Sequence, residues 1–176
     1  MSQARIPPHN LDAERALLGA LLVEPDRVAE TVEKLSSEDF FDPRHAAVFD
    51  AISTLASRGV AVELVTTLEQ VTAMGKSVGG MAWLIELTHT VSSAAHLRHH
   101  TKIVHETSLL RKLIRESGEI IAQAYETRPD GDAVRELVSA SEDRMFKVNS
   151  GGGGSEVLSM EAAVGEAFKR IDSSTH

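Results

Sequence analysis

The amino-acid sequence predicts an all-α protein: a compact helical N-terminal domain with an αα-hairpin, then a flexible tether and a linker helix. Of its 176 residues, 42% are hydrophobic but only 4% are aromatic. The interior must therefore consist mainly of Leu, Ile, Val and Ala, which favours packed helices. Apolar residues also recur three, four or seven positions apart, which is the spacing of one helix face. The longest such pattern, at residues 93–125, contains no proline.

Residues 93–125 form the helix around which we expect the rest of the chain to be arranged. Ser92 or Ser93 can cap its first turn, and Gly118 marks either a weak point or the close approach of another helix. The pattern is longer than most helices of globular proteins. We therefore expect its first half to belong to the globular domain and its second half to pair with a following helix. Its apolar positions are Leu97, Ile103, Val104, Leu110, Leu113, Ile114, Ile120, Ile121 and Ala124.

The first helix follows a short polar arm at residues 1–9. Asn10 is a good N-cap, and Asp12 and Glu14 carry negative charge near the positive end of the helix dipole. The buried stripe of this helix is expected to be Leu17, Leu18, Leu21 and Leu22.

Two further helices are marked by proline. One follows Pro25, and its inward positions are Val28, Val32 and Leu35. Asp42 and Pro43 start the next, because proline at the first helical position loses no needed hydrogen bond. Gly59 ends that helix just after its last residue, where glycine is preferred.

Residues 60–87 are expected to form one extended segment followed by two helices. Residues 60–65 are partly β-branched, and we expect them to be extended. Thr66 or Thr67 then caps another helix. A short helix at 81–87 carries Trp83, the only tryptophan.

The C-terminal part begins with a tight turn at 129–131, after which Asp132 caps a helix that completes an αα-hairpin. A glycine-rich segment then forms a flexible tether. The final helix is too short to be stable alone in water, so its apolar stripe is expected to dock on something outside the domain. The predicted units are a globular domain at 1–107, the hairpin at 108–149, the tether at 150–158 and the linker helix at 159–172.

Composition narrows the class of protein. The absence of cysteine excludes disulfide frameworks and cysteine-ligated zinc, and agrees with a reducing cytosol. The sequence contains no run of about 18 apolar residues, so no membrane span is expected. The N-terminus also lacks a signal-peptide pattern. A net charge of −8 argues against broad non-specific binding to nucleic acid. Any work on DNA would then pass through protein partners.

No catalytic, cofactor-binding or metal-binding residue is predicted. The one glycine run lacks the lysine and the preceding strand of a phosphate-binding loop, and no serine is distinguished as a nucleophile. His96 and His100 lie one helical turn apart and could ligate zinc or nickel, but a site needs further ligands. We favour a solvated or interfacial histidine-rich turn, and a His-dependent metal-binding protein stays as an alternative.

Trp83 and the apolar residues of the hairpin are ambiguous. Trp83 could anchor the core or contact a partner, since tryptophan is enriched at binding hot spots. A two-helix hairpin has too little material to bury all its apolar positions. Some of Leu113, Ile114 and Ile120 are therefore expected to face another subunit or protein.

Several motifs occur in one order along the chain. The run Ile6-Pro-Pro-His-Asn-Leu-Asp-Ala-Glu-Arg-Ala-Leu-Leu-Gly-Ala-Leu-Leu22 is followed by Asp39-Phe-Phe, His45 with Val48-Phe49, Val62-Glu-Leu-Val-Thr66, Val78-Gly-Gly80 with Trp83-Leu84, Ser93-Ala-Ala95 with Ile103-Val104, and Leu110-Arg-Lys-Leu-Ile-Arg115. Together these motifs resemble the opening of the bacterial replicative DNA helicases of the DnaB family. The resemblance covers residues 6–171, and its specificity lies in the number and order of the motifs.

The resemblance implies an N-terminal domain with its helical hairpin and linker helix. In the family such domains pair through their hairpins, form a trimer-of-dimers collar above six ATP-driven motor domains, and recruit the C-terminal domain of primase. The expected contacts are Trp83, Ile114 and Ile120 for primase, Leu113, Leu137 and Phe146 for hairpin pairing, and Val164, Phe168 and Ile171 for docking of the linker helix on the motor domain of a neighbouring subunit.

By the same resemblance, ATP and Mg²⁺ belong to the motor of a longer parent helicase, and this chain holds no cofactor. The motor ring grips DNA, so the collar would touch DNA only indirectly, at the replisome in the cytoplasm and away from membranes. Two interpretations stay open: a fragment of a longer helicase, or a stand-alone helical adaptor or regulator without a motor.

The chain departs from the family pattern at three places. Ser92-Ser-Ala-Ala-His96 stands where Pro-Ser-Ala-Ala-Asn is usual, and both His100 and Trp83 stand where tyrosine is usual. These are local surface or capping changes that bear on details of packing and partner contact.

Overall fold

All regular elements in the described part of the chain are helices, which confirms the all-α prediction. The computed structural model describes residues 6–89 and 96–150. The elements are α1 (Leu11–Val23), the 3₁₀ turn η1 (Pro25–Arg27), α2 (Val28–Val32), the 3₁₀ turn η2 (Ser37–Asp39), α3 (Pro43–Ser57), α4 (Leu64–Ala73), α5 (Gly80–His89), α6 (Leu97–Glu126) and α7 (Gly131–Ser150). The predicted tether at 150–158 and linker helix at 159–172 fall, apart from Ser150, outside the described residues.

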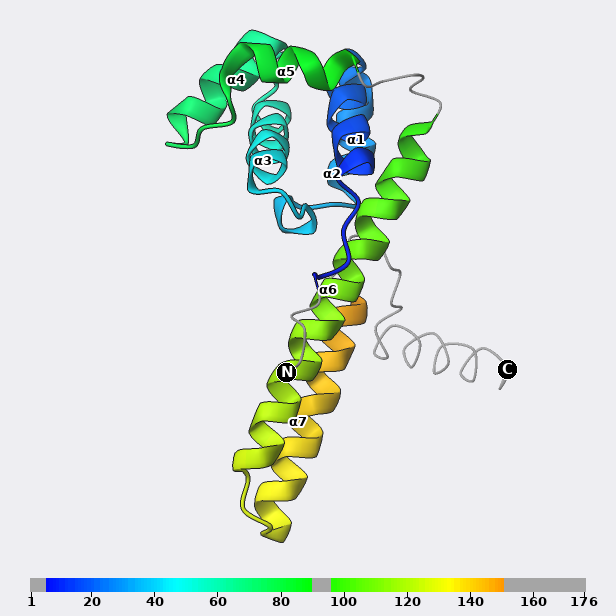
Figure 1. Ribbon diagram of the computed structural model, residues 1–176, viewed down its shortest axis with the longest axis vertical. Helices are drawn as coiled ribbons and strands as arrows, with labels where there is room; N and C mark the ends of the chain where they lie inside the picture. The colour runs from blue at the N-terminus through cyan, green and yellow to red at the C-terminus, as the bar shows by residue number, and fades with distance from the viewer. Residues whose placement is uncertain (1–5, 90–95, 151–176) are drawn as a thin grey trace, which may run out of the picture.

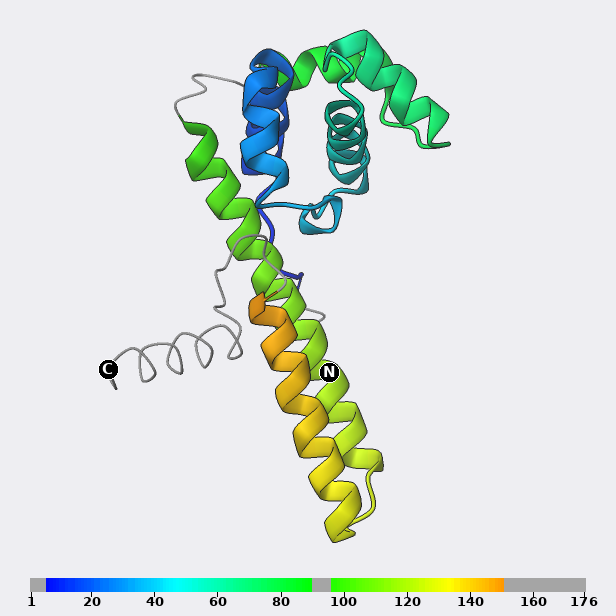
Figure 2. The same ribbon diagram turned by 180° about the vertical axis from the view of Figure 1, so that it is seen from behind.

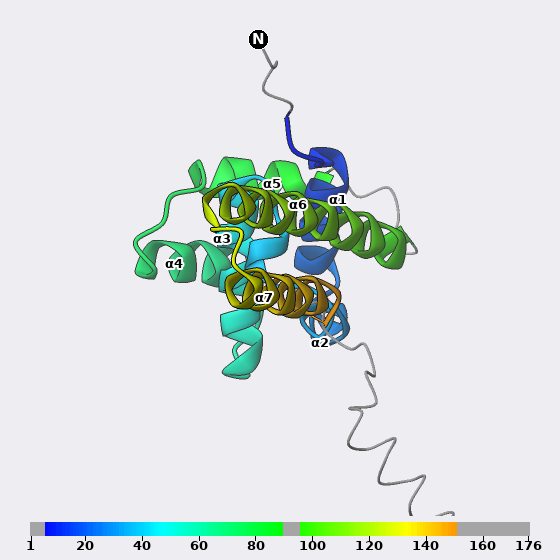
Figure 3. The same cartoon turned by 90° about the horizontal axis from the view of Figure 1, so that it is seen from below.

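The helices form a globular head and a long stalk (Figure 1). The head contains α1 to α5 together with the first turns of α6. Helix α6 continues beyond the head, and α7 returns beside it as the second helix of the stalk, as the views from behind and from below also show (Figures 2 and 3). The predicted hairpin is thus present. No described helix is long and apolar enough to cross a membrane.

Helix α1 is the centre of the head, where it packs against α3, α5 and α6. Its predicted cap is confirmed, since the Asn10 side chain accepts a hydrogen bond of 3.0 Å from the Ala13 backbone N–H. The four predicted leucines of its stripe are all buried. Around them the core includes Val28, Leu35, Phe40, Val48, Phe49, Ile52, Leu55, Val71, Leu84, Leu87, Leu97 and Val104.

Helix α3 starts and ends where the sequence predicts, whereas α4 starts earlier than predicted. Asp42 caps α3 by accepting from the Arg44 N–H at 2.8 Å, and Gly59 follows the helix with φ of +66°. The prediction that 60–65 is extended is wrong for its last two residues, because α4 already begins at Leu64. The hydroxyl of Thr66 lies inside the first turn and accepts from the Glu63 N–H at 3.0 Å, so the cap lies earlier than predicted.

Helices α6 and α7 make the hairpin with small differences from its predicted details. Helix α6 is continuous through Gly118, and a Cβ added there would meet nothing within 4 Å. The expectation of a close approach of another helix at Gly118 is thus wrong for the residues that the structure describes. Helix α7 begins at Gly131, and its first turn is capped by Asp130, which accepts from the Asp132 N–H at 3.2 Å. Asp132, predicted to be the cap, lies inside the helix.

The carboxylate of Asp39 joins the head to the stalk. Asp39 is buried on η2 and accepts hydrogen bonds from the hydroxyl of Ser108 and from Lys112 Nζ at 2.7 Å, both on α6. Its backbone oxygen accepts from Arg111 Nη2 at 2.6 Å, and Arg111 Nη1 donates to the Pro8 oxygen at 2.9 Å. Arg111 thus ties both η2 and the N-terminal arm to the middle of α6.

Substitution Asp39→Ala is expected to lower the free energy of unfolding by about 2 to 4 kcal/mol, because it leaves Ser108 and Lys112 without their acceptor in a buried site. Urea denaturation followed by circular dichroism measures this change. Asp132→Ala is the matched control, because that carboxylate is exposed on the stalk and its pair with Arg135 contributes no more than about 1 kcal/mol. Equal losses in the two variants would contradict the role of Asp39.

Candidate protein-interaction surfaces

The stalk exposes an unusual amount of apolar surface. From residue 109 to residue 148, every side chain on α6 and α7 is half-buried or exposed, so Ser108 is the last buried residue in this range of the stalk helices. The exposed large apolar residues, which we call the stalk stripe, are Leu110, Leu113, Ile114, Ile121, Tyr125, Val134, Val138 and Phe146. A helical hairpin with this many exposed large apolar side chains is typical of a site that another protein covers.

The stripe on α6 follows from helical spacing. Leu110, Leu113 and Ile114 are three and four residues apart, and Ile121 and Tyr125 continue seven and eleven residues after Ile114. These intervals keep all five on one side of the helix. Tyr125 is exposed to 89% and Ile114 to 55%, so the α6–α7 contact itself does not cover this side.

Polar groups hold the two stalk helices together near the head. Arg144 of α7 and Glu116 of α6 form an ion pair with 3.6 Å between Nη1 and Oε2. Ile120 and Leu137 are each half-buried, whereas Leu113 and Phe146 belong to the exposed stripe. Of the three residues predicted for hairpin pairing, Leu113 and Phe146 thus present apolar surface to the outside, and Leu137 is half-covered within the stalk.

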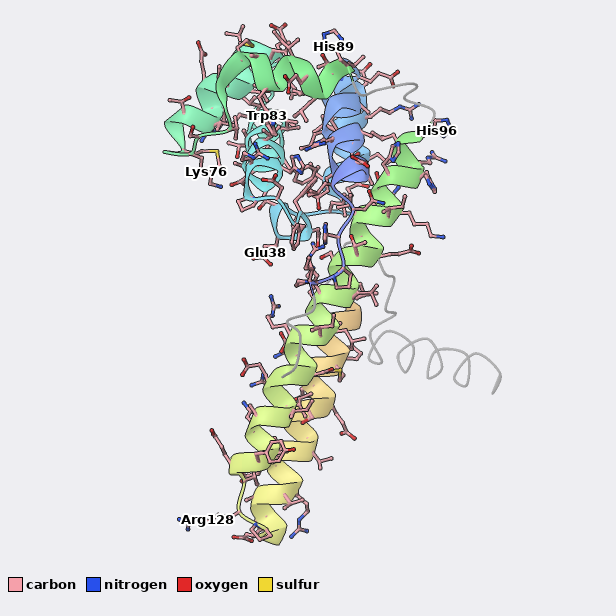
Figure 4. All side chains as sticks on the ribbon, viewed as in Figure 1. Glu38, Lys76, Trp83, His89, His96 and Arg128 are labelled. Carbon is pink, nitrogen blue, oxygen red and sulfur yellow. The ribbon has the colours of Figure 1, made fainter. Side chains whose placement is uncertain are left out.

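Trp83 lies in the head, apart from the other two residues predicted to contact primase. Figure 4 shows it on α5, facing α3, whereas Ile114 and Ile120 lie on the stalk part of α6. Its indole is half-buried against the core, stacks on His45 with 5.7 Å between ring centroids, and carries the Arg44 guanidinium at 5.2 Å from its ring. One edge of this ring thus packs inward while part of it stays accessible.

A buried polar pair that the sequence did not predict packs against Trp83 through one of its members, His45. His45 Nδ1 and Glu14 Oε2 share a hydrogen bond of 2.7 Å, and both side chains are fully buried. Glu14 also accepts from the backbone N–H groups of Phe41 at 2.8 Å and Asp42 at 3.3 Å. The sequence predicts only that Glu14 carries negative charge near the start of the first helix. Its spacing of three and four residues from Leu17 and Leu18 was the available sign that it lies on the buried face.

The histidine-rich turn forms the start of α6, where Figure 4 marks His96. The rings of His96 and His100 are 6.5 Å apart and those of His99 and His100 are 5.8 Å apart. Within residues 6–89 and 96–150, no three His, Cys, Asp or Glu side chains are grouped so that they could hold a metal ion. Burial, with the neighbouring imidazoles of His99 and His96, holds the pKa of His100 below its ordinary value.

Residues Val164, Phe168 and Ile171, predicted to dock the linker helix, lie outside the described residues. The division of the chain at 107/108 remains a prediction. So do the residues expected to contact primase, to pair the hairpins and to dock the linker helix, although the structure now locates the first two groups in the fold.

Comparison with known proteins identifies one family. Residues 6–106 match the family described as DnaB-like helicase N terminal domain. The chain is 36% identical to the replicative DNA helicase DnaC of Bacillus subtilis strain 168 over 146 residues, which cover 82% of this chain and 32% of that protein. The chain thus spans about a third of the length of this curated relative.

Solved structures share the fold. The chain is similar to the crystal structure of the N-terminal domain of DnaB helicase from Mycobacterium tuberculosis, with a TM-score of 0.73, 32% identity, and coverage of 81% of this chain and 99% of that chain. A DnaB-like replicative helicase has the same fold at a TM-score of 0.65 and 24% identity, with coverage of 93% of this chain and 35% of that chain.

The lowered pKa of His100 makes the stability of the head depend on pH. The unfolded chain takes up a proton on this residue more readily than the folded one, so the free energy of unfolding should fall as the pH decreases through about 6.5. His100→Gln removes this proton uptake and should lose less stability than the parent chain between about pH 7.5 and 5.5. Thermal unfolding at a series of pH values measures the difference.

The matched control for that measurement is His89→Gln, at the exposed end of α5. A His89→Gln curve that flattens as much as that of His100→Gln would contradict the assignment to His100. A His100→Gln curve parallel to that of the parent would contradict the assignment.

Proposed function

Since this chain belongs to the DnaB-like helicase N-terminal domain family, we propose that it is the collar of a replicative DNA helicase, which joins copies of the helicase to one another and recruits primase. The longer parent protein would be an ATP-dependent DNA helicase, and ATP and Mg²⁺ would bind its motor domain. The role of this chain is positional, at the replisome in the cytoplasm.

The observation that carries the proposal is the stalk stripe. Most large apolar side chains of the head are buried, although Ile6, Val23, Val60, Val65 and Ile85 are exposed. The stalk buries none of its side chains between residues 109 and 148 and leaves eight large apolar ones exposed. Exposed apolar surface is costly in water and is retained where a partner covers it. A second copy of the same hairpin offers a complementary apolar surface, since a two-fold axis would pair each stripe with itself.

Primase recruitment is proposed for the surfaces around Trp83, Ile114 and Ile120. A DnaB-like replicative helicase of the same fold is known with its interactions with primase. Ile114 is exposed, and both Ile120 and Trp83 are half-buried. Trp83 lies in the head and the two isoleucines lie in the stalk. One primase domain would therefore reach all three only by contacting both a head and a stalk, either of the same copy or of two paired copies.

Docking of the linker helix through Val164, Phe168 and Ile171 on the motor domain of a neighbouring subunit completes the proposed assembly. The stand-alone adaptor stays the second candidate, and it shares the pairing of hairpins but needs no motor. The metal-binding alternative gains no ligand set from the residues that the structure describes.

Pairing through the hairpin predicts that Leu113→Asp combined with Phe146→Asp weakens self-association at least about tenfold, because two carboxylates would be buried in the apolar interface. Light scattering after size-exclusion chromatography over a concentration series measures this loss. The control is Ala122→Asp combined with Ala140→Asp, which adds the same charges at exposed positions of α6 and α7 outside the stripe. An unchanged molar mass in the first variant would place the interface elsewhere.

Primase docking predicts that Ile114→Ala weakens binding of the C-terminal domain of the cognate primase by about fivefold to tenfold, because a buried aliphatic side chain at an interface contributes about 1 kcal/mol or more. Isothermal titration calorimetry measures the affinity. Val65→Ala on α4 is the matched control, because Val65 is a similarly exposed aliphatic residue at 54% and lies in the head. If both variants bind like the parent chain, primase does not use this part of α6.

A further inference from the structure

A groove between α2 and the first turns of α6 is separate from the surfaces described above. Its volume is about 350 Å³, and it is lined by Glu30, Thr31, Lys34, Leu97, Arg98, Thr101, Lys102 and His105. Helices α2 and α6 lie beside each other there in Figure 2. The volume is in the range of pockets that bind small ligands or one or two side chains of a peptide. None of the residues proposed for primase or hairpin contacts lines it.

The rim of the groove is positively charged. Lys34, Arg98 and Lys102 stand against the single carboxylate of Glu30 among the lining residues. Lys34 Nζ lies 2.9 Å and Arg98 Nε 3.2 Å from the same Glu30 oxygen, and Lys102 Nζ lies 3.7 Å from Oε1 of Glu106 outside the lining. Two carboxylates thus pair with the three cations and leave one positive charge in excess. Hydrogen bonding from Lys34, with the charge of Arg98, lowers the pKa of Glu30. The local excess of positive charge contrasts with a net charge of −8 for the whole chain.

The floor of the groove is apolar. Leu97 is buried at its base. The hydroxyl groups of Thr31 and Thr101 donate to the backbone oxygens of Arg27 and Leu97, both at 2.9 Å. These hydrogen atoms are therefore already used within the helices, and a ligand meets mainly hydrocarbon between the charged side chains.

We propose that this groove binds an acidic peptide segment of a partner protein, with one large apolar side chain on the floor and its carboxylates on Lys34, Arg98 and Lys102. Charge complementarity selects the acidic partner, since like charge elsewhere on the chain repels it. The apolar floor selects a side chain rather than a free inorganic anion. The lining contains no Phe, Tyr or Trp on which nucleobases could stack, so a single-stranded nucleic acid fits less well than a peptide.

The test uses the whole chain and a fluorescent, aspartate-rich peptide that contains one phenylalanine. Fluorescence anisotropy should detect saturable binding that weakens as salt is added. A peptide with asparagine in place of aspartate, and one with alanine in place of phenylalanine, should each bind at least about tenfold more weakly. Equal binding of the asparagine peptide would overturn the ionic part of the proposal, and equal binding of the alanine peptide would overturn the role of the floor.

The location is tested by Arg98→Ala combined with Lys102→Ala, which should reduce the peptide affinity at least about tenfold. Both side chains are more than two thirds exposed, so the fold is preserved, and circular dichroism verifies it. Arg135→Ala is the matched control, because Arg135 has the same 79% side-chain exposure as Arg98 and one carboxylate partner, Asp132. It should bind like the parent chain.

Two further outcomes would contradict the proposal. Unchanged affinity in the double variant would place the peptide outside this groove. Tighter binding of an oligothymidylate than of the acidic peptide, with loss in the same double variant, would make the groove a nucleic-acid surface. These outcomes leave the collar proposal untouched, because that proposal depends on the stalk.

Discussion

The buried carboxylate of Asp39 determines how the two parts of this protein are joined. Burial alone would raise the pKa of Asp39, but hydrogen bonds from Lys112, Ser108 and Ser36 more than offset this effect and hold its pKa below the ordinary value. The charged carboxylate thus binds η2 to α6 at the level where α6 leaves the head, and Arg111 extends the contact to the N-terminal arm. The direction of the stalk, and with it every surface the stalk carries, depends on this cluster.

Above this junction the chain behaves as a self-sufficient globular domain, and below it the chain does not. Helix α1 is surrounded by α3, α5 and α6, so the leucines of its stripe are buried. Helices α6 and α7 have only each other, and two helices cannot surround their own apolar residues. The same helix, α6, therefore serves as a core element in its first turns and as a presentation surface in the rest. This division is the physical basis for the proposal that the stalk pairs with a second copy of itself.

The two surfaces of the head that we propose as binding sites differ in chemistry from the stalk. The half-buried Trp83 is held by the Arg44 guanidinium and by the buried pair of His45 and Glu14, so its accessible edge is fixed in place. A rigid aromatic ring loses little conformational entropy when it is covered. The groove between α2 and α6 instead combines fixed positive charge with a hydrocarbon floor. If the proposed partners bind these surfaces together, each would raise the local concentration of the others.

The sequence by itself determined the features that depend on near neighbours in the chain: the caps at Asn10 and Asp42, the glycine after α3, the leucine stripe of α1, and the hairpin with its surplus of apolar residues. It placed the N-cap of α4 three to four residues late, because the hydroxyl of Thr66 accepts its hydrogen bond from inside the helix and the cap is Glu63. Only the tertiary structure decided the roles of Glu14 and Asp39, since their partners His45 and Ser108 are 31 and 69 residues away. A carboxylate looks the same in the sequence whether it faces water or a buried donor. Its surroundings are set by which helices pack against it, and that is a property of the whole fold.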